Sequence, residues 1–365
     1  MARAVELTTS QDMKNLLAAP GMIREDVMNK IWDISKIPLP FTDLVSTGTS
    51  KQSYTEWVLD SLASPCGIDS AYAANAYNDG CDIAASSMPS GVRVGNHHQI
   101  MMKTVNVSYR SDASDTIGRS KELAYQLMRK QQELRRDVEF TLLLNQASRA
   151  ETNNTDATTP PLLGGLPSWL ATNFKSVGTG SPVAGGFNTG TKLTAAATAG
   201  TAEAALTEKA LRDMVESVYT QGGDAGFMMT VPGIVSRFSE FMIKTGAAHA
   251  NIQTEVMQEA KAATAIGAVN VFVTDFGTLR VIPNRLQPRY NTGLTPVKAG
   301  ARADVFILDP SYLEIAYLQG YKTEELAKTS LSTKKAMFVD ITLKVLTEKA
   351  HGIIRDVSVS TAMTA

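Results

Sequence analysis

The chain is poor in cysteine, in net charge and in long apolar runs, and each shortage narrows the classes of protein it can belong to. Its 365 residues contain two cysteines, Cys66 and Cys81, which we interpret as free thiols in a reducing compartment, although the two could also pair. The formal charge of -1 implies no basic face, so duplex DNA is not expected as a direct partner. No charged and apolar leader opens the sequence, and no apolar run approaches the roughly 18 residues of a membrane span. We therefore expect a soluble protein made inside the cell.

Two segments near the N-terminus have too few apolar residues to form a core of their own. Residues 1 to 52 lack a regular period, and Pro38 and Pro40 force an extended path, because proline fixes φ and disfavours helix in the residue before it. Residues 53 to 110 run out and return, and their middle, residues 64 to 95, is rich in Ala, Gly, Ser, Asn and Asp. A structureless stretch of about 30 residues does not suit a compact domain. It suits a loop that packs against another subunit.

The most informative stretch joins an alternating strand to one long helix. In residues 103 to 109, Val105, Val107 and Tyr109 fall on one face, which predicts a half-buried strand. From residue 119 to residue 147, apolar side chains recur at steps of four and seven, the period of an amphipathic helix. This stripe consists of Leu123, Leu127, Leu134, Val138 and Leu142. A helix of that span would be roughly 43 Å long at about 1.5 Å per residue, which favours a scaffold over the wall of a small-molecule pocket.

The rest of the chain is a polar insertion followed by regular helix and strand patterns. Residues 148 to 205 are rich in Thr, Ala, Gly and Asn, and they predict a surface loop around one anchored patch at residues 164 to 170. From residue 207 the periodicity predicts helices and short strands. The expected elements are a helix ending at Gly222 and Gly223, a strand stopped by Pro232, a second helix, a hairpin turning at Gly277, a strand at residues 305 to 308, an alternating strand at residues 339 to 345, and a partner strand after Gly352.

No motif in the sequence carries a recognisable chemistry. Asp275, Phe276 and Gly277 spell the magnesium motif of kinases, but no glycine-rich loop or His-Arg-Asp loop accompanies them, so we interpret them as a hairpin turn. His97 and His98 are neighbours on a strand, where side chains point to opposite faces, so they are poorly placed to ligate one ion. No paired nucleophile and base is visible, although the members of a triad can lie anywhere in a sequence. We therefore expect no catalytic residue, no metal and no cofactor.

Short segments spread in order over most of the chain resemble a known family, the major capsid proteins of tailed bacteriophages. No single motif is decisive, but their ordered combination is specific, and only residues 1 to 22 and 150 to 205 show nothing that matches. The principal matching segments are Arg24-Glu25-Asp26, Glu56-Trp57, Lys103-Thr104-Val105, Gly118-Arg119, Glu122-Leu123-Ala124-Tyr125, Glu133-Leu134, Arg136-Asp137, Glu139, Gly165-Leu166, Trp169, Thr274-Asp275-Phe276-Gly277, Asn284-Arg285, Leu308-Asp309-Pro310 and Ala350-His351-Gly352.

This resemblance implies the Johnson fold, an α+β fold shared by tailed-phage and herpesvirus capsids. The segments without a core then have an explanation, because neighbouring subunits supply one. The implied division of the chain is an N-arm at residues 1–52, an extended β-hairpin loop at 53–110, a peripheral domain with the spine helix and a variable loop insertion at 111–206, an axial domain at 207–335, and C-terminal strands returning to the peripheral domain at 336–365.

The resemblance also implies a function and a set of partners. The protein is expected to be a major capsid protein that self-assembles as pentamers and hexamers into the icosahedral head enclosing double-stranded viral DNA. It would be assembled in the host cytoplasm and end in the virion, holding DNA without sequence-specific binding and contacting no membrane. The expected partners are further copies of itself, a scaffolding protein, a portal at one vertex and, as an option, a decoration protein. The alternatives are a cargo-enclosing nanocompartment of the same fold and an enzyme with a dispersed active site.

Five residues are candidates for contacts between subunits. Ile83, Met88 and Val92 are apolar side chains of the loop that a neighbouring subunit could cover on assembly. Arg135 and Arg136 belong to a charged run of the long helix. We interpret that run as a solvated face, on which Arg129 can pair with Glu133 and Arg135 with Glu139 along the helix. An ion-pair network between subunits is the alternative.

Overall fold

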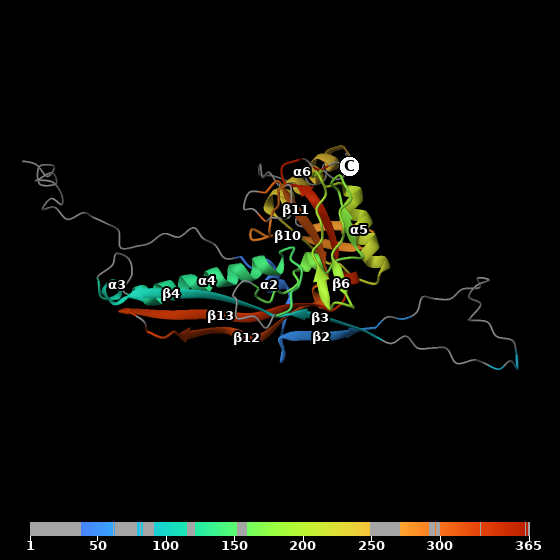
Figure 1. Ribbon diagram of the computed structural model, residues 1–365. Coiled ribbons are helices and arrows are strands. Elements are labelled where there is room, and N and C mark those ends of the chain that lie inside the picture. The colour runs from blue at the N-terminus through green and yellow to red at the C-terminus, as the bar shows by residue number, and fades with distance from the viewer. Residues whose placement is uncertain are drawn as a thin grey trace, which may run out of the picture.

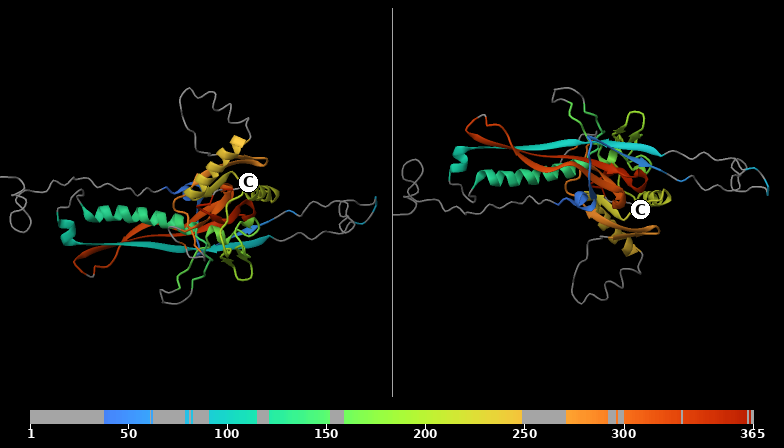
Figure 2. Two further views of the ribbon diagram at one scale, coloured as in Figure 1. Left: turned by 90° about the horizontal axis from the view of Figure 1, so that it is seen from above. Right: turned by 90° about the horizontal axis from the view of Figure 1, so that it is seen from below.

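The computed structural model in Figure 1 describes residues 38–60, 62, 79–80, 82, 91–114, 121–151, 159–248, 271–291, 296, 300–328, 330–361 and 363, apart from the side chains of residues 241–248. These residues form an elongated unit, a more compact second unit beside one end of it, and a two-stranded ribbon that points away from both (Figures 1 and 2). Each of the two units is built on one sheet. One hydrophobic core packs the four-stranded sheet against the long helix and also takes in Met229, Phe306, Leu308 and Ile353 of the six-stranded sheet, so it is shared by the two units, and a second core lies within the second unit.

The elongated unit is a four-stranded sheet covered by one long helix. Its strand order is β1-β12-β13-β4, with β1 parallel to β12 and the other pairs antiparallel. Strand β13 alternates as the sequence predicts, because Val339, Ile341, Leu343 and Val345 are buried while the residues between them are mostly part-exposed. These four side chains share one core with the helix. The bounds are β1 Ser46–Thr49, β4 Gln99–Ser108, β12 Leu313–Glu325, β13 Ser332–Val345 and α4 Glu122–Leu142.

The second unit is a six-stranded mixed sheet with helices packed against it. Its strand order is β5-β14-β11-β8-β10-β9, and every residue of the two central strands β11 and β14 is buried. Helix α5 begins at a Thr207 cap and ends before Gly222, whose φ of 91° only glycine adopts freely. The bounds are β5 Phe174–Ser176, α5 Glu208–Thr220, β8 Phe227–Thr230, α6 Pro232–Ala248, β9 Val271–Thr274, β10 Gly277–Pro283, β11 Arg302–Leu308 and β14 Gly352–Ser358.

One predicted turn and several smaller elements complete the fold. The turn predicted at Gly277 is confirmed, because β9 and β10 pair antiparallel across Asp275 and Phe276. The remaining elements are α2 Pro40–Leu44, β2 Tyr54–Leu59, β3 Val92–His97, α3 Tyr109–Ala113, β6 Gly186–Asn188, β7 Leu193–Ala195, and single 3-10 turns at Leu166–Ser168, Pro310–Tyr312 and Glu348–Ala350.

The long helix is shorter than predicted at both ends. Lys121 is extended, with φ -140° and ψ 120°, so the helix begins at Glu122, and residues 119 and 120 lie outside the described residues. At the other end the helix stops at Leu142, because Asn145 turns away to exchange two hydrogen bonds with the backbone of Ala197. The 21 residues correspond to roughly 31 Å at about 1.5 Å per residue. Tyr109 was predicted in the preceding strand, but it opens α3, which Ser108 caps.

The sequence predicted that the strand after Gly352 pairs with the alternating strand at residues 339 to 345. It does not. It crosses to the other unit as β14, between β11 and β5. Asn173 redirects the chain there, because its amide donates to the carbonyls of Lys349 and His351 at 2.7 and 3.0 Å. The strands in residues 336–358 are therefore divided between the two sheets, and β12 pairs within the four-stranded sheet.

The polar insertion is more ordered than predicted. Described residues of this segment include fully buried Leu163, Leu166, Leu170 and Ala197. Its β6–β7 hairpin is held to the end of the long helix, where the Thr194 amide donates to Ser148 at 2.7 Å. Residues 152–158 lie outside the described part. A composition typical of a surface loop here encodes a packed connector between the two units.

Candidate assembly interfaces

Helix α4 has one face buried in its own subunit. Leu134, Val138 and Leu142 are each at most 1% exposed, which confirms this part of the predicted stripe. The helix is also tied to the sheet by an ion pair of 2.6 Å between the Lys103 ammonium and the Asp137 carboxylate. Two members of the stripe nearer the start of the helix are only half-buried: Leu123 and Leu127. This face is therefore a structural scaffold and not an interface.

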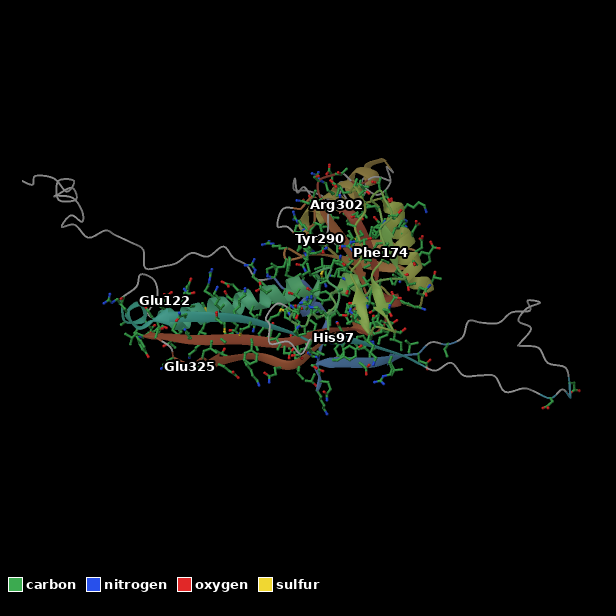
Figure 3. The ribbon with its side chains drawn as sticks, in the orientation of Figure 1. His97, Glu122, Phe174, Tyr290, Arg302 and Glu325 are labelled. Carbon is green, nitrogen blue, oxygen red and sulfur yellow. The ribbon has the colours of Figure 1, made fainter. Side chains whose placement is uncertain are left out.

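Arg135 is exposed on the same helix, and the contact of Arg135 and Arg136 with other subunits stays a prediction. The Arg135 side chain is not simply solvated, however, because its guanidinium carbon lies 5.6 Å from the centre of the Tyr321 ring on β12. Burial raises the pKa of Tyr321 to about 12, the neighbouring Tyr317 adds to the rise, and Arg135 opposes it. Arg136 is half-buried. Figure 3 shows that Glu122 and Glu325 both lie at the end of this unit that is far from the second unit.

The charged run pairs differently from the expected pattern. Glu133 receives a contact of 2.6 Å from Lys130, three residues earlier. Glu139 was predicted to pair with Arg135 on a solvated face, but Glu139 is completely buried and bonds to other parts of the chain. The sequence signal that could have indicated this burial is its position between Val138 and Leu142, beside the apolar stripe.

The buried carboxylate of Glu139 accepts four hydrogen bonds. Its donors are the Phe41 and Thr42 amides at 2.8 Å each, the Thr42 hydroxyl at 2.6 Å and the Asn284 amide group at 2.8 Å. Burial raises the pKa of Glu139, and the hydrogen bonds from Thr42, Phe41 and Asn284 partly offset the rise. The helix, the end of the arm and the segment after β10 therefore meet at one side chain.

The β2–β3 ribbon is anchored at its base. The Trp57 ring lies 5.4 Å from Trp169, which in turn stacks on Phe187 of the insertion. Lys192 of the same insertion reaches the Glu56 carboxylate at 3.5 Å, and Glu56 also pairs with Arg93 across the ribbon. These contacts fix the direction in which the ribbon leaves the body.

The outer end of the ribbon exposes apolar side chains. Val58 is 63% exposed and Val92 is 48% exposed, although Val94, two residues further along β3, is buried. Val92 is thus an exposed apolar residue, and its contact with a neighbouring subunit stays a prediction. Ile83 and Met88 lie outside the described residues. The ribbon points away from the side of the molecule that carries α4, so the structure does not bring Val92 together with Arg135 and Arg136 (Figure 1).

The second unit contains two buried ion pairs with a structural role. The Arg302 guanidinium is 3.3 Å from the Asp356 carboxylate, and the Arg355 guanidinium is 3.3 Å from Asp304. Burial raises the pKa of Asp304 to about 6, with Arg355 opposing the rise and Asp356 adding to it. Arg302 also donates to the Gly200 carbonyl at 2.7 Å, and Asp356 accepts from the Gly200 amide at 2.8 Å. The pairs thereby hold the insertion on the sheet, and Figure 3 marks Arg302 in this unit.

The histidines predicted to be unsuited to a shared metal have separate surroundings. His97 packs its ring 4.5 Å from Tyr54, and burial lowers its pKa, with His98 adding to the effect. His98 is buried beside Thr55, at 2.9 Å, and Asp340, at 3.5 Å. Across the part of the chain that the structure describes, no three His, Cys, Asp or Glu side chains are grouped to hold a metal ion. None of the described helices is long and apolar enough to cross a membrane.

Comparison with known sequences points to one family. The profile described as SU10 major capsid protein matches residues 6–358. A curated relative, the "Major capsid protein" of Escherichia phage Phieco32, is 28% identical over 282 residues, which cover 71% of this chain and 77% of the relative.

Comparison with solved structures identifies the fold. The capsid of cyanophage P-SCSP1u aligns over 99% of both chains with a TM-score of 0.55 and 11% identity. The capsid of a native GTA particle covers 92% of this chain and 96% of its own, with a TM-score of 0.54 and 12% identity. The SrpI encapsulin of Synechococcus elongatus covers 93% and 95%, with a TM-score of 0.51 and 11% identity. The arrangement of helices and sheets is the expected α+β Johnson fold, and with the match over nearly its whole length the chain belongs to the SU10 major capsid protein family and is a phage major capsid protein.

Proposed function

We propose that this protein assembles as pentamers and hexamers that close into an icosahedral head around double-stranded DNA. The observation that carries the proposal is the β2–β3 ribbon with its exposed Val58 and Val92. An isolated two-stranded ribbon is marginally stable in water, and exposed apolar side chains at its outer end favour burial against another surface. In a closed shell, a neighbouring copy supplies that surface.

We assign the domains of the capsid fold to the two units. The four-stranded sheet with α4 is the peripheral domain, and the six-stranded sheet is the axial domain. This proposal revises the sequence-based boundaries, because β12 goes to the peripheral domain and β14 to the axial domain. Residues 1–52 remain the N-arm, whose last described part pairs as β1 with β12. The extended loop keeps residues 53–98 of the predicted 53–110, because β4 belongs to the four-stranded sheet. The insertion at residues 159–206 is the connector that sets the angle of the loop.

Further partners are proposed from the chemistry of shell assembly. A shell built from many copies of one subunit needs control of its curvature, which a separate scaffolding protein would supply, and one vertex would hold a portal. A decoration protein on the lattice is an optional addition. The formal charge of -1 suits enclosure of DNA without sequence-specific binding. Assembly in the host cytoplasm and the absence of catalytic activity belong to the same proposal.

Electron microscopy of the purified product tests the proposal. The protein is coexpressed with its scaffolding partner, and the expected result is closed megadalton particles with five-fold and six-fold capsomers. A monodisperse monomer or dimer under mild salt, with no particles in any preparation, would overturn it. The nucleic acid content of particles purified from infected cells separates the head from the nanocompartment alternative. A head contains viral double-stranded DNA, and a nanocompartment contains protein cargo.

A further inference from the structure

Glu139 connects three parts of the molecule that are distant in sequence. Its Oε1 accepts the Phe41 amide and the Asn284 side-chain amide, and its Oε2 accepts the Thr42 amide and the Thr42 hydroxyl. Phe41 and Thr42 lie in α2 at the end of the arm, and Asn284 directly follows β10 of the second unit. We call Glu139 and its four donors the joint. The joint lies where the arm, the long helix and the second unit meet.

The chemistry of the joint requires a carboxylate. Only an ionised carboxylate offers two oxygens that both accept without donating, so it can satisfy four donors at once. A glutamine of the same shape presents an NH₂ group to one pair of donors, which leaves buried donors facing each other. Burying a carboxylate is unfavourable unless its oxygens are fully hydrogen-bonded, so all four donors must be held in place together.

Each partner of Glu139 is itself fixed to a different part of the fold. Phe41 is completely buried in the core of the first unit. Asn284 is also completely buried, and its side-chain oxygen accepts the Leu286 amide at 2.8 Å, which orders the chain after β10. From α2 the arm continues directly into β1 at the edge of the sheet. A displacement of the arm at Phe41 therefore also disturbs the hydrogen bond of Glu139 with Asn284, and a displacement of Asn284 disturbs the arm.

We propose that Glu139 is a positioning residue for assembly, which fixes the direction of the arm and couples it to the junction between the two units. A displacement of the second unit relative to α4 pulls Asn284 from the shared carboxylate and loosens Phe41 and Thr42. A shift of the arm acts in reverse on the segment after Asn284. This inference rests on the proposed function, because the direction of the arm matters for assembly only if the arm contacts neighbouring subunits.

Hydrogen exchange on unassembled subunits tests the coupling. The variant is Glu139→Gln, and the matched control is Glu133→Gln, two turns earlier on the same helix, where the carboxylate is part-exposed and contacts Lys130. We expect exchange of the Phe41, Thr42 and Leu286 amides to rise together by about tenfold in Glu139→Gln, the effect of losing one charge-assisted hydrogen bond, and to stay unchanged in the control. Faster exchange at Phe41 and Thr42 with no change at Leu286 would overturn the coupling.

A milder variant and an assembly assay complete the test. Thr42→Val removes one donor and keeps the size of the side chain, so it remains informative if Glu139→Gln fails to fold. We expect it to shift exchange at Leu286 in the same direction and to lower the yield of regular particles, while Thr42→Ser behaves like the wild type. Wild-type yield and shape in Thr42→Val and Glu139→Gln particles would overturn the positioning role. If the wild type itself forms no particles, the proposed function fails and the positioning role in assembly fails with it. Exchange at the Leu286 amide then still decides whether Glu139 couples the arm to the second unit.

Discussion

The indole of Trp169 and the phenyl ring of Phe187 stack with their centres 5.5 Å apart and their planes within 1° of parallel. Trp169 is buried and also contacts Trp57, so the stack joins the insertion hairpin to the base of the β2–β3 ribbon. Stacked aromatic pairs contribute about 0.5–1.5 kcal/mol beyond the area they bury. The stack therefore links the orientation of the ribbon to a segment that has no strand in either large sheet.

Replacing Phe187 with alanine should weaken this link. Phe187 is half-buried, so we expect Phe187→Ala to lower the free energy of unfolding of the isolated subunit by about 1–3 kcal/mol, less than for a fully buried ring. Denaturant unfolding followed by tryptophan fluorescence measures the loss. Phe276→Ala is the control, because Phe276 lies 5.3 Å from Tyr219 at the exposed end of a hairpin. Equal losses for the two variants would contradict a special role for the stack.

The buried stripe of α4 can be tested against its outer face. We expect Leu134→Ala to cost about 2–5 kcal/mol of subunit stability, because it leaves a cavity at a position that is 1% exposed. Arg135→Ala should cost no more than about 1 kcal/mol, the loss of one exposed cation–π contact with Tyr321. Thermal unfolding of isolated subunits measures both. The assignment of the two faces is wrong if the two variants lose the same stability.

Val92 and Val94 form a matched pair on one strand for testing the interface. Val92 is half exposed and Val94 is buried. We expect Val92→Ser to change the stability of the unassembled subunit by no more than about 0.5 kcal/mol and to reduce the yield of particles. Val94→Ser should destabilise the subunit itself by about 1–3 kcal/mol, because it places a hydroxyl in the core. An assembly yield for Val92→Ser equal to that of the wild type would remove Val92 from the interface.

Acid should destabilise the subunit through His351. This side chain is completely buried, its ring nitrogen Nδ1 accepts the Asp309 amide at 3.2 Å, and burial lowers its pKa to about 4. The unfolded chain takes up the proton near pH 6.5, so between pH 6.5 and pH 4 the unfolded state binds more protons and stability falls as the pH falls. The stabilisation is complete above pH 6.5, and its full loss is about 3 kcal/mol.

The contribution of His351 is isolated as a difference between two proteins. Asp304 acts in the opposite direction, because its raised pKa of about 6 gives stability that is lost as the pH rises through that value. His351→Gln keeps a hydrogen-bond acceptor and removes the titration. We therefore expect the wild type to lose about 3 kcal/mol more than the variant between pH 7 and pH 4 in denaturant titrations. Parallel pH profiles would show that the pKa of His351 does not differ between the folded and unfolded states.

The sequence predicted local elements well where one period dominated. The stripe through Leu134, Val138 and Leu142 indicated the buried face of α4, and the alternation from Val339 to Val345 indicated β13. Both patterns arise because a helix or a strand buries one face against a core. The hairpin at Gly277 was also predictable, because tight turns favour glycine between two apolar runs.

The burial of Glu139 and the pairing of β14 could not be predicted in the same way. A glutamate in a charged run is normally solvated, and only the distant donors of Phe41, Thr42 and Asn284 make its burial tolerable. Similarly, an apolar strand after Gly352 fits either sheet, and the choice depends on Asn173, which is 176 residues away from the Lys349 carbonyl that it binds. Periodicity reports which face of an element is buried, and not which distant surface covers it.

The crossing of the last strands between the two sheets has a consequence for biosynthesis. Strand β14 is the last strand of the described chain in sequence, yet it lies inside its sheet, between β5 and β11. The ribosome therefore releases residues 174–308 before the strand that completes their sheet exists, and β11 keeps an unpaired edge until residue 358 has emerged. A chain that ends before residue 352 therefore lacks an inner strand of this sheet, and we expect it not to reach the fold from which a shell is built.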